Sequence, residues 1–152
     1  MRIKVSLDST WDLSKELSEK YGIDILPLYI VDGVNSYKDG IEITPLELYT
    51  KVKETKSLFS TSAIPVYDYV QYFKKTLFDY DAIIHITISS KISYCYQNAN
   101  IAASEFKNIF IVDSLRLSGA VSILAILADD LVSLGLEPEK IYLEDFSKLI
   151  FS

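Results

Sequence analysis

The run Ala82-Ile83-Ile84-His85-Ile86-Thr87-Ile88-Ser89-Ser90 decides the fold of this chain. Its first seven residues are mostly β-branched, a pattern typical of a parallel strand that is buried on both faces. Two serines end the strand, and a segment with helical spacing follows from about Ser93 to Phe106. We therefore expect a buried strand that leads through a short polar loop into a helix.

Strand and helix patterns alternate on both sides of this run. Downstream, residues 108–112 predict another strand, and a long apolar helix follows from about Leu117 to Leu134. Upstream, residues 2–7 alternate apolar and polar side chains, and Ser9 is predicted to cap the helix that follows. This alternation predicts an α/β fold with an open, mainly parallel sheet and helices on both faces.

The part of the chain between these segments is predicted to add two strands and two helices. Residues 23–31 are apolar enough for a strand, and Pro27 within them favours an edge position or a bulge. Residues 44–47, Thr-Pro-Leu-Glu, predict a capped helix start. A short strand is expected at residues 58–60, and an amphipathic helix begins at Val66.

Composition and charge exclude several classes of protein. The chain has 152 residues, the size of one domain, and its 15 Lys and Arg against 21 Asp and Glu give a formal charge of −6. No basic run could follow a phosphate backbone, so we expect no nucleic-acid partner. The start of the sequence lacks a signal-peptide core, and the longest apolar stretch stops at Asp129. We therefore expect a cytoplasmic protein without a membrane span.

Catalytic and metal sites lack the groups that they require. One cysteine and one histidine cannot build a four-ligand zinc site, and no glycine-rich phosphate loop is present, so we expect neither metal nor cofactor. His85 lies inside the predicted strand, far from the position of a base at a strand end, and Cys95 has no neighbour that would activate it. One enzyme class stays open, a phosphate-ester hydrolase or transferase that uses Asp8 and the serines at the strand ends.

Hydroxyl side chains gather at the predicted carboxyl ends of the strands. They occur at residues 8–10, 89–93 and 113–114, and Thr61-Ser62 precedes the helix that begins at Val66. Each cluster alone is typical of an ordinary helix cap. Ligands of parallel sheets collect beyond the carboxyl ends of the strands, and helix N-termini attract anions. We therefore expect the hydroxyls to bind the polar head of an amphiphile whose chain lies on apolar surface behind them.

The order of these clusters resembles the DegV family of bacterial fatty-acid-binding proteins. The resemblance extends over most of residues 3–135 and rests on seven pieces, namely residues 8–13, 21–28, 37–39, 61–62, 88–93, 96–99 and 112–114. It implies a lipid-binding protein that buries the acyl chain of a long-chain fatty acid and holds the carboxyl group with Ser and Thr hydroxyls. It also implies a carrier without catalysis of its own. A fatty acid kinase as partner would convert the bound acid to an acyl-phosphate for phospholipid synthesis.

The resemblance assigns site residues one by one. The head-group ligands fall on Thr61 and Ser93, and Ser62 is a weaker candidate. Tyr94 stands where the family has glycine, so its side chain either crowds the carboxylate, contributes its hydroxyl or changes the approach of the backbone. The Thr-Ser motif continues into residues 63–65, Ala-Ile-Pro, where the family usually has Gln-Pro-Ser.

Only the N-terminal half of the family's length is matched. The resemblance therefore divides the chain into a DegV-like N-terminal domain over residues 1–136 and a C-terminal helical extension over residues 137–152, with the family's second domain absent. The extension is expected to form an amphipathic helix through Ile141, Phe146, Leu149 and Ile150. Half of a lipid tunnel exposes apolar surface, so we expect this helix or a homodimer partner to cover it. The third alternative is an interaction module that binds no ligand.

Overall fold

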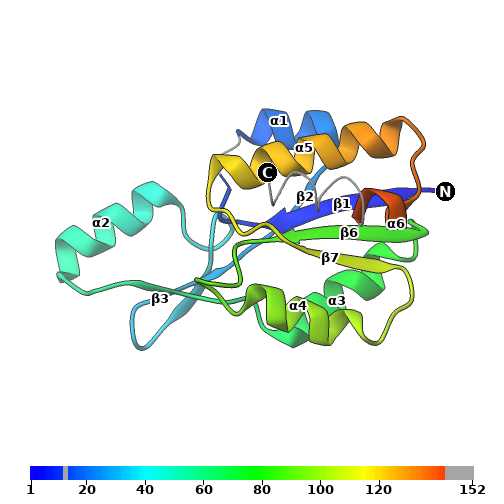
Figure 1. Cartoon of the computed structure of the whole chain (residues 1–152). Helices are drawn as coiled ribbons and strands as arrows, with labels where there is room; N and C mark the ends of the chain where they lie inside the picture. The colour runs from blue at the N-terminus through cyan, green and yellow to red at the C-terminus, as the bar shows by residue number, and fades with distance from the viewer. Residues whose placement is uncertain (12–13, 143–152) are drawn as a thin grey trace.

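The computed structural model of the chain describes residues 1–11 and 14–142 (Figure 1). Its main sheet contains four parallel strands in the order β2-β1-β6-β7. The strands are β1 (Ile3–Asp8), β2 (Asp24–Leu26), β6 (Ala82–Thr87) and β7 (Ile109–Asp113). The predicted open parallel sheet is confirmed.

Helices cover both faces of the main sheet, as predicted (Figure 1). On one face α5 (Gly119–Ser133) packs against β1 and β6, and α1 (Lys15–Tyr21) lies on the same side. On the other face α4 (Cys95–Ala103) packs against β6 and β7, and α3 (Val66–Thr76) packs beside α4. The sheet is therefore enclosed between two helical layers.

The residues of β6 divide between two hydrophobic cores, one on each face of the main sheet. Ile84 and Ile86 belong to the core that includes α5, whereas Ile83 belongs to the core that includes α3 and α4. Successive side chains of a strand point to opposite faces, so a strand that is covered on both faces needs apolar residues at consecutive positions. All six residues of β6 are buried, which explains the unbroken apolar run in the sequence.

A second, smaller sheet extends from the main sheet (Figure 1). It is antiparallel and has the order β4-β3-β5, formed by β3 (Tyr29–Val31), β4 (Ser36–Lys38) and β5 (Ser60–Ser62). The helix α2 (Pro45–Thr55) lies at its outer end and has no buried residue. The capped start that the sequence predicts is confirmed, because the Thr44 side chain accepts from Glu47 N–H and the Glu47 carboxylate accepts from Thr44 N–H.

Two strand predictions in this region are wrong in their bounds. Residues 23–31 form β2 and β3, which belong to different sheets, where the sequence predicts one strand. Pro27 separates them because proline has no N–H to donate to a strand ladder. The prediction that Pro27 marks an edge is consistent with β2, which is an edge strand. The short strand expected at residues 58–60 begins two residues later, at Ser60.

The predicted N-cap of the first helix is also wrong. The α1 helix starts at Lys15, and Ser14 is its N-cap, accepting from the backbone N–H of Leu17 at 3.4 Å. The Ser9 hydroxyl instead donates to Asp39 at 2.7 Å and accepts from Leu28 N–H at 3.0 Å. Ser9 therefore joins the end of β1 to the segment that leads into the small sheet.

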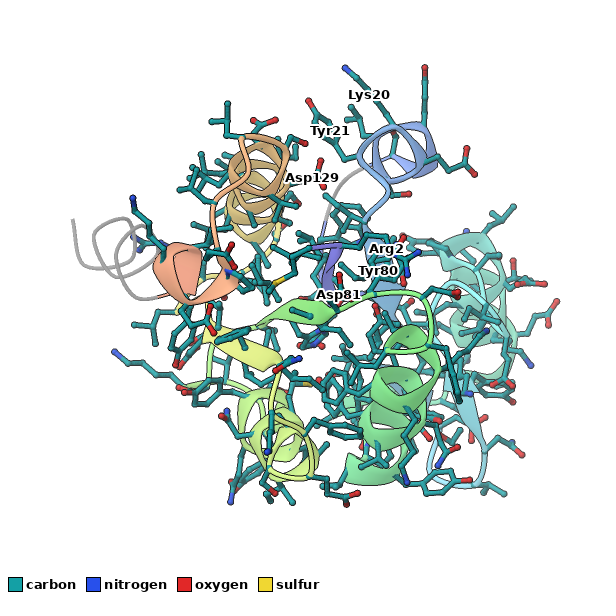
Figure 2. The ribbon with its side chains drawn as sticks, turned by 90° about the vertical axis from the view of Figure 1, so that its right-hand side faces the viewer. Arg2, Lys20, Tyr21, Tyr80, Asp81 and Asp129 are labelled. Carbon is teal, nitrogen blue, oxygen red and sulfur yellow. The ribbon has the colours of Figure 1, made fainter. Side chains whose placement is uncertain are left out.

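The amino ends of the strands are held by local polar contacts (Figure 2). Arg2, Tyr80 and Asp81 lie at this edge, where Asp81 accepts a hydrogen bond from the Arg2 backbone N–H at 2.6 Å. The Lys4 ammonium group lies 4.6 Å from the centroid of the Tyr80 ring. The hydroxyl clusters singled out in the sequence lie at the opposite edge of the sheet.

The last described residues close the core under α5. The short helix α6 (Pro138–Lys140) begins at the predicted Pro138, and Ile141 is fully buried in the same core as Ile84. Phe146, Leu149 and Ile150, which complete the expected amphipathic helix, lie outside the described residues. Within the described part of the chain, none of the helices has the length and apolar character needed to span a bilayer.

Candidate functional site

A cleft of about 400 Å³ lies at the carboxyl edge of the main sheet, where the small sheet joins it. Loops after three parallel strands contribute to it, because residue 10 follows β1, residues 88–94 follow β6 and residue 117 follows β7. Its lining consists of Thr10, Leu28, Thr61, Ala63, Ile88, Ile92, Ser93, Tyr94 and Leu117. Three of the four residues that the resemblance assigns, Thr61, Ser93 and Tyr94, therefore line one cleft.

Ser93 occupies the turn that leads from β6 into α4. Its backbone N–H donates to Ser89 O at 3.2 Å, and its Oγ accepts a hydrogen bond from the backbone N–H of Cys95 at 3.2 Å. A hydroxyl that accepts one hydrogen bond keeps its own hydrogen to donate. Ser93 can thus donate a hydrogen bond just before the N-terminus of α4, where the helix dipole also favours negative charge.

Thr61 and Ser62 are neighbours in β5 with different surroundings. Thr61 pairs with Ile30 of β3, and Ser62 pairs with Tyr29. Because side chains alternate along a strand, only one of the two can face the cleft. Thr61 lines the cleft, and Ser62 does not.

Tyr94 lies at the mouth of the cleft and is 73% exposed. Its φ of −82° is accessible to any residue, so the backbone at this position does not require the glycine of the family. Ile92 and Leu117 are also exposed at the mouth, at 60% and 56%. These three residues form an apolar rim, and it lies on loops whose other residues are mainly polar.

The lining is chemically simple. Among the described residues it contains three hydroxyl side chains of Ser or Thr, one phenol and five apolar side chains, and none that is charged. Such a cleft can donate hydrogen bonds to a polar group and bury apolar surface behind it. The sequence signal for the apolar part is weak, because Ile92 and Leu117 are single apolar residues within polar loops.

A buried polar network lies beneath the cleft and fixes the end of β1. Asp8 is fully buried, and its Oδ1 accepts from the Tyr69 hydroxyl at 2.8 Å and contacts His85 Nε2 at 3.1 Å. Its Oδ2 accepts from the backbone N–H of Ile88 at 3.1 Å, and Ser6 Oγ contacts His85 Nδ1 at 2.9 Å. Burial, followed by the charge of Asp8, holds the pKa of Tyr69 well above its usual range, so Tyr69 stays a donor.

This network bears on the enzyme class that the sequence leaves open. Both oxygens of Asp8 already have partners inside the core, so the carboxylate does not face the cleft. His85 lies within β6 and is fully buried, as expected for a residue of the sheet core. Burial, and then the charge of Asp8, raise the pKa of the Cys95 thiol. In residues 1–11 and 14–142, no group of three His, Cys, Asp or Glu is placed to hold a metal ion.

The DegV family model, described as an uncharacterised protein family, matches residues 2–145. The Fatty acid-binding protein of Thermotoga maritima is 33% identical over 145 residues, which cover 93% of this chain and 50% of that protein. The crystal structure of DegV of Bacillus subtilis, described as a fatty acid binding protein, superposes with a TM-score of 0.91 at 31% identity, over 100% of this chain and 55% of that one.

A further solved structure shares the fold at lower identity. It is the Fatty Acid Kinase (Fak) B3 protein of Streptococcus pneumoniae, loaded with linoleic acid, with a TM-score of 0.82 at 19% identity over 99% of this chain and 55% of that one. The chain spans about half the length of the curated relatives that it matches. The family match over residues 2–145 and the agreement in fold lead to one conclusion: this chain belongs to the DegV family.

Proposed function

We propose that this chain binds a long-chain fatty acid, with the carboxyl group at the hydroxyls of the cleft and the acyl chain on its apolar wall. One observation carries the proposal. Thr61 and Ser93 come from different elements and lie 32 positions apart in the sequence, yet both line a cleft whose other side chains are mainly apolar. The printed descriptions of the relatives from Thermotoga maritima and Bacillus subtilis support the same class of ligand.

The hydroxyls suit a carboxyl group that must later react. The Ser93 oxygen accepts a hydrogen bond from Cys95 N–H, which uses a lone pair and leaves the hydroxyl hydrogen for a ligand. Neutral donors orient the head group, whereas a desolvated Lys or Arg would stabilise the bound acid strongly without favouring a later transition state. The absence of charged residues from the described lining is consistent with this role.

Most of the affinity comes from the acyl chain. Each buried methylene contributes about 0.8 kcal/mol, so ten of them supply roughly 8 kcal/mol before the cost of association is subtracted. The apolar rim of Ile92, Tyr94 and Leu117 extends the wall beyond the cleft. A second copy of the chain, or the segment after residue 142, would cover the part of the acyl chain that lies on this rim.

The proposed role is that of a carrier. The head-group hydroxyls lie at an open edge of the sheet, where a partner can reach the carboxyl group. A fatty acid kinase that docks there would phosphorylate the carboxyl group to an acyl-phosphate, while this chain binds and orients the acid. The family resemblance is the support for this partner.

Native mass spectrometry of the protein purified from bacterial cells tests the proposal. We expect an added mass in the range of long-chain fatty acids, which lipid extraction then identifies. An unliganded protein that also fails to take up oleic or palmitic acid would contradict it. The same spectra report the oligomeric state. A monomer without lipid would also argue against the expectation that a second copy of the chain covers the apolar rim. Metal-dependent hydrolysis of small phosphate esters would support the enzyme class instead.

A further inference from the structure

Two buried hydroxyl oxygens, Thr10 Oγ1 and Ser122 Oγ, have no hydrogen-bond partner among the described residues. A buried hydroxyl without a partner loses its hydrogen bonds to water and gains none, so each such group in a native protein requires an explanation. The two lie in different places. Ser122 belongs to α5, whereas Thr10 follows β1 and lines the cleft.

The residues before Thr10 show that its hydroxyl is an exception at this strand end. Asp8 uses both carboxylate oxygens, and the Ser9 hydroxyl both donates to Asp39 and accepts from Leu28 N–H. These side chains fix the position of residue 10 at the cleft. Thr10 itself contributes nothing to that fixation through its Oγ1.

We propose that Thr10 is a third hydroxyl ligand of the head group, beside Thr61 and Ser93. The inference rests on the proposed fatty acid binding. In the free protein Thr10 Oγ1 is shielded from solvent although the residue lines the cleft. A rotation about χ1 between staggered rotamers moves a threonine hydroxyl to the position of another substituent. A carboxylate in the cleft supplies the acceptor that makes this rotation favourable.

The three hydroxyls approach the cleft from different elements. Thr10 follows β1 and Ser93 follows β6, and these two strands are paired neighbours in the main sheet. Thr61 comes from β5 of the small sheet. A carboxylate offers about four acceptor sites on two oxygens, so it can accept from all three hydroxyls. A ligand with one head-group oxygen cannot use all of them equally well.

The test compares Thr10→Val, which keeps the shape and removes the hydroxyl, with Thr10→Ser, which keeps the hydroxyl. We expect Thr10→Val to weaken palmitic acid binding about 5- to 20-fold and Thr10→Ser to stay within about threefold of the wild type. The Tm of the ligand-free Thr10→Val protein should not fall, because the hydroxyl makes no bond there. Ser122→Ala is the matched control: it removes the other unpartnered hydroxyl and should leave the affinity unchanged.

A double-variant comparison shows whether Thr10 acts through the head group. In a Thr61→Ala/Ser93→Ala background two of the three hydroxyl ligands are gone and the head group is poorly positioned, so the effect of Thr10→Val should shrink to less than about threefold. An undiminished effect of Thr10→Val in the double-variant background would overturn the proposal. A lower Tm of the ligand-free Thr10→Val protein would also overturn it, as would fatty acid binding by Thr10→Val at the wild-type affinity. If Thr61→Ala and Ser93→Ala weaken binding and Thr10→Val does not, only the inference on Thr10 fails. If the wild type binds no fatty acid, the proposed function fails as well.

Discussion

Asp8 Oδ2 accepts a hydrogen bond from the backbone N–H of Ile88 at 3.1 Å, and this bond joins the end of β1 to the start of the loop that carries Ser93. The other oxygen of Asp8 holds Tyr69 and His85. A single carboxylate thus connects two neighbouring strands, the helix α3 and the loop that lines the cleft.

Asp8→Ala should destabilise the fold strongly. It leaves the Tyr69 hydroxyl and the Ile88 N–H buried without this acceptor, and each buried donor left unsatisfied costs about 1–3 kcal/mol. Urea unfolding followed by circular dichroism measures the loss. Asp79→Ala, at an exposed position, is the control and should change the free energy of unfolding by less than about 0.5 kcal/mol. Similar losses of unfolding free energy in Asp8→Ala and Asp79→Ala would contradict the stabilising role of the Asp8 network.

Thr61→Ala combined with Ser93→Ala should weaken fatty acid binding by roughly 10- to 100-fold, because each removes a donor to a charged carboxylate. Isothermal calorimetry with palmitic acid measures it. Ser93→Ala also removes the acceptor of Cys95 N–H, so we expect a loss of about 1 kcal/mol in unfolding free energy from that variant alone. Ser62→Ala is the matched control on the same strand. If Ser62→Ala weakens binding equally, the head group lies on the other side of β5 and not in the cleft that Thr61 lines.

Tyr94→Gly, which restores the family residue, should weaken binding a few-fold. The ring is part of the apolar rim, and its removal exposes more of the bound acyl chain to water. Tyr94→Phe should bind like the wild type, because it keeps the ring that forms part of the apolar rim. Tighter binding by Tyr94→Gly would show instead that the ring crowds the carboxylate.

Cys95 should react slowly with Ellman's reagent in the folded protein. The side chain is fully buried, and burial followed by the charge of Asp8 raises the pKa of its thiol. Only the thiolate attacks the reagent, so both effects lower the rate. We expect the reaction at pH 8 to be at least about 100-fold slower than in urea-unfolded protein, the internal control. A fast reaction in the folded state would mean that α4 opens at its N-terminus.

Asp129→Asn should stabilise the protein at pH 7. Asp129 lies on the side of α5 that faces α1 (Figure 2), and burial, followed by the charge of Asp130, raises its pKa. A raised pKa means that the folded state holds the proton more tightly than the unfolded state, so stability falls as pH rises through this range. The gain in Tm should therefore vanish well below pH 3.8, the ordinary pKa of Asp. Asp79→Asn is the exposed control and should show no such gain.

The sequence predicts the main sheet well because burial on both faces leaves a direct pattern. The unbroken apolar run of β6 and the spacing of α3 need no tertiary information to be recognised. The small sheet lacks such a pattern: each of its strands has three residues, and all three residues of β5 are exposed. Local patterns therefore give it no clear bounds.

Tertiary hydrogen bonds explain the error at Ser9. Ser9 and Ser14 both precede a helical segment, and only the hydrogen bonds of Ser9 to the Leu28 N–H and the Asp39 carboxylate, which are distant in sequence, distinguish their roles. The site shows the same limit. Spacing alone does not bring Thr61 and Ser93 together, and the family resemblance supplied that expectation. Thr10 could be singled out only once its missing partner was known.

The two proposed head-group ligands are held by different sheets. Thr61 lies in the small sheet and Ser93 follows β6 of the main sheet. The gap between their oxygens therefore depends on how the small sheet is placed against the main sheet, and not on the strand pairing within either sheet. An acid bound by both residues would therefore bridge the two sheets at the cleft.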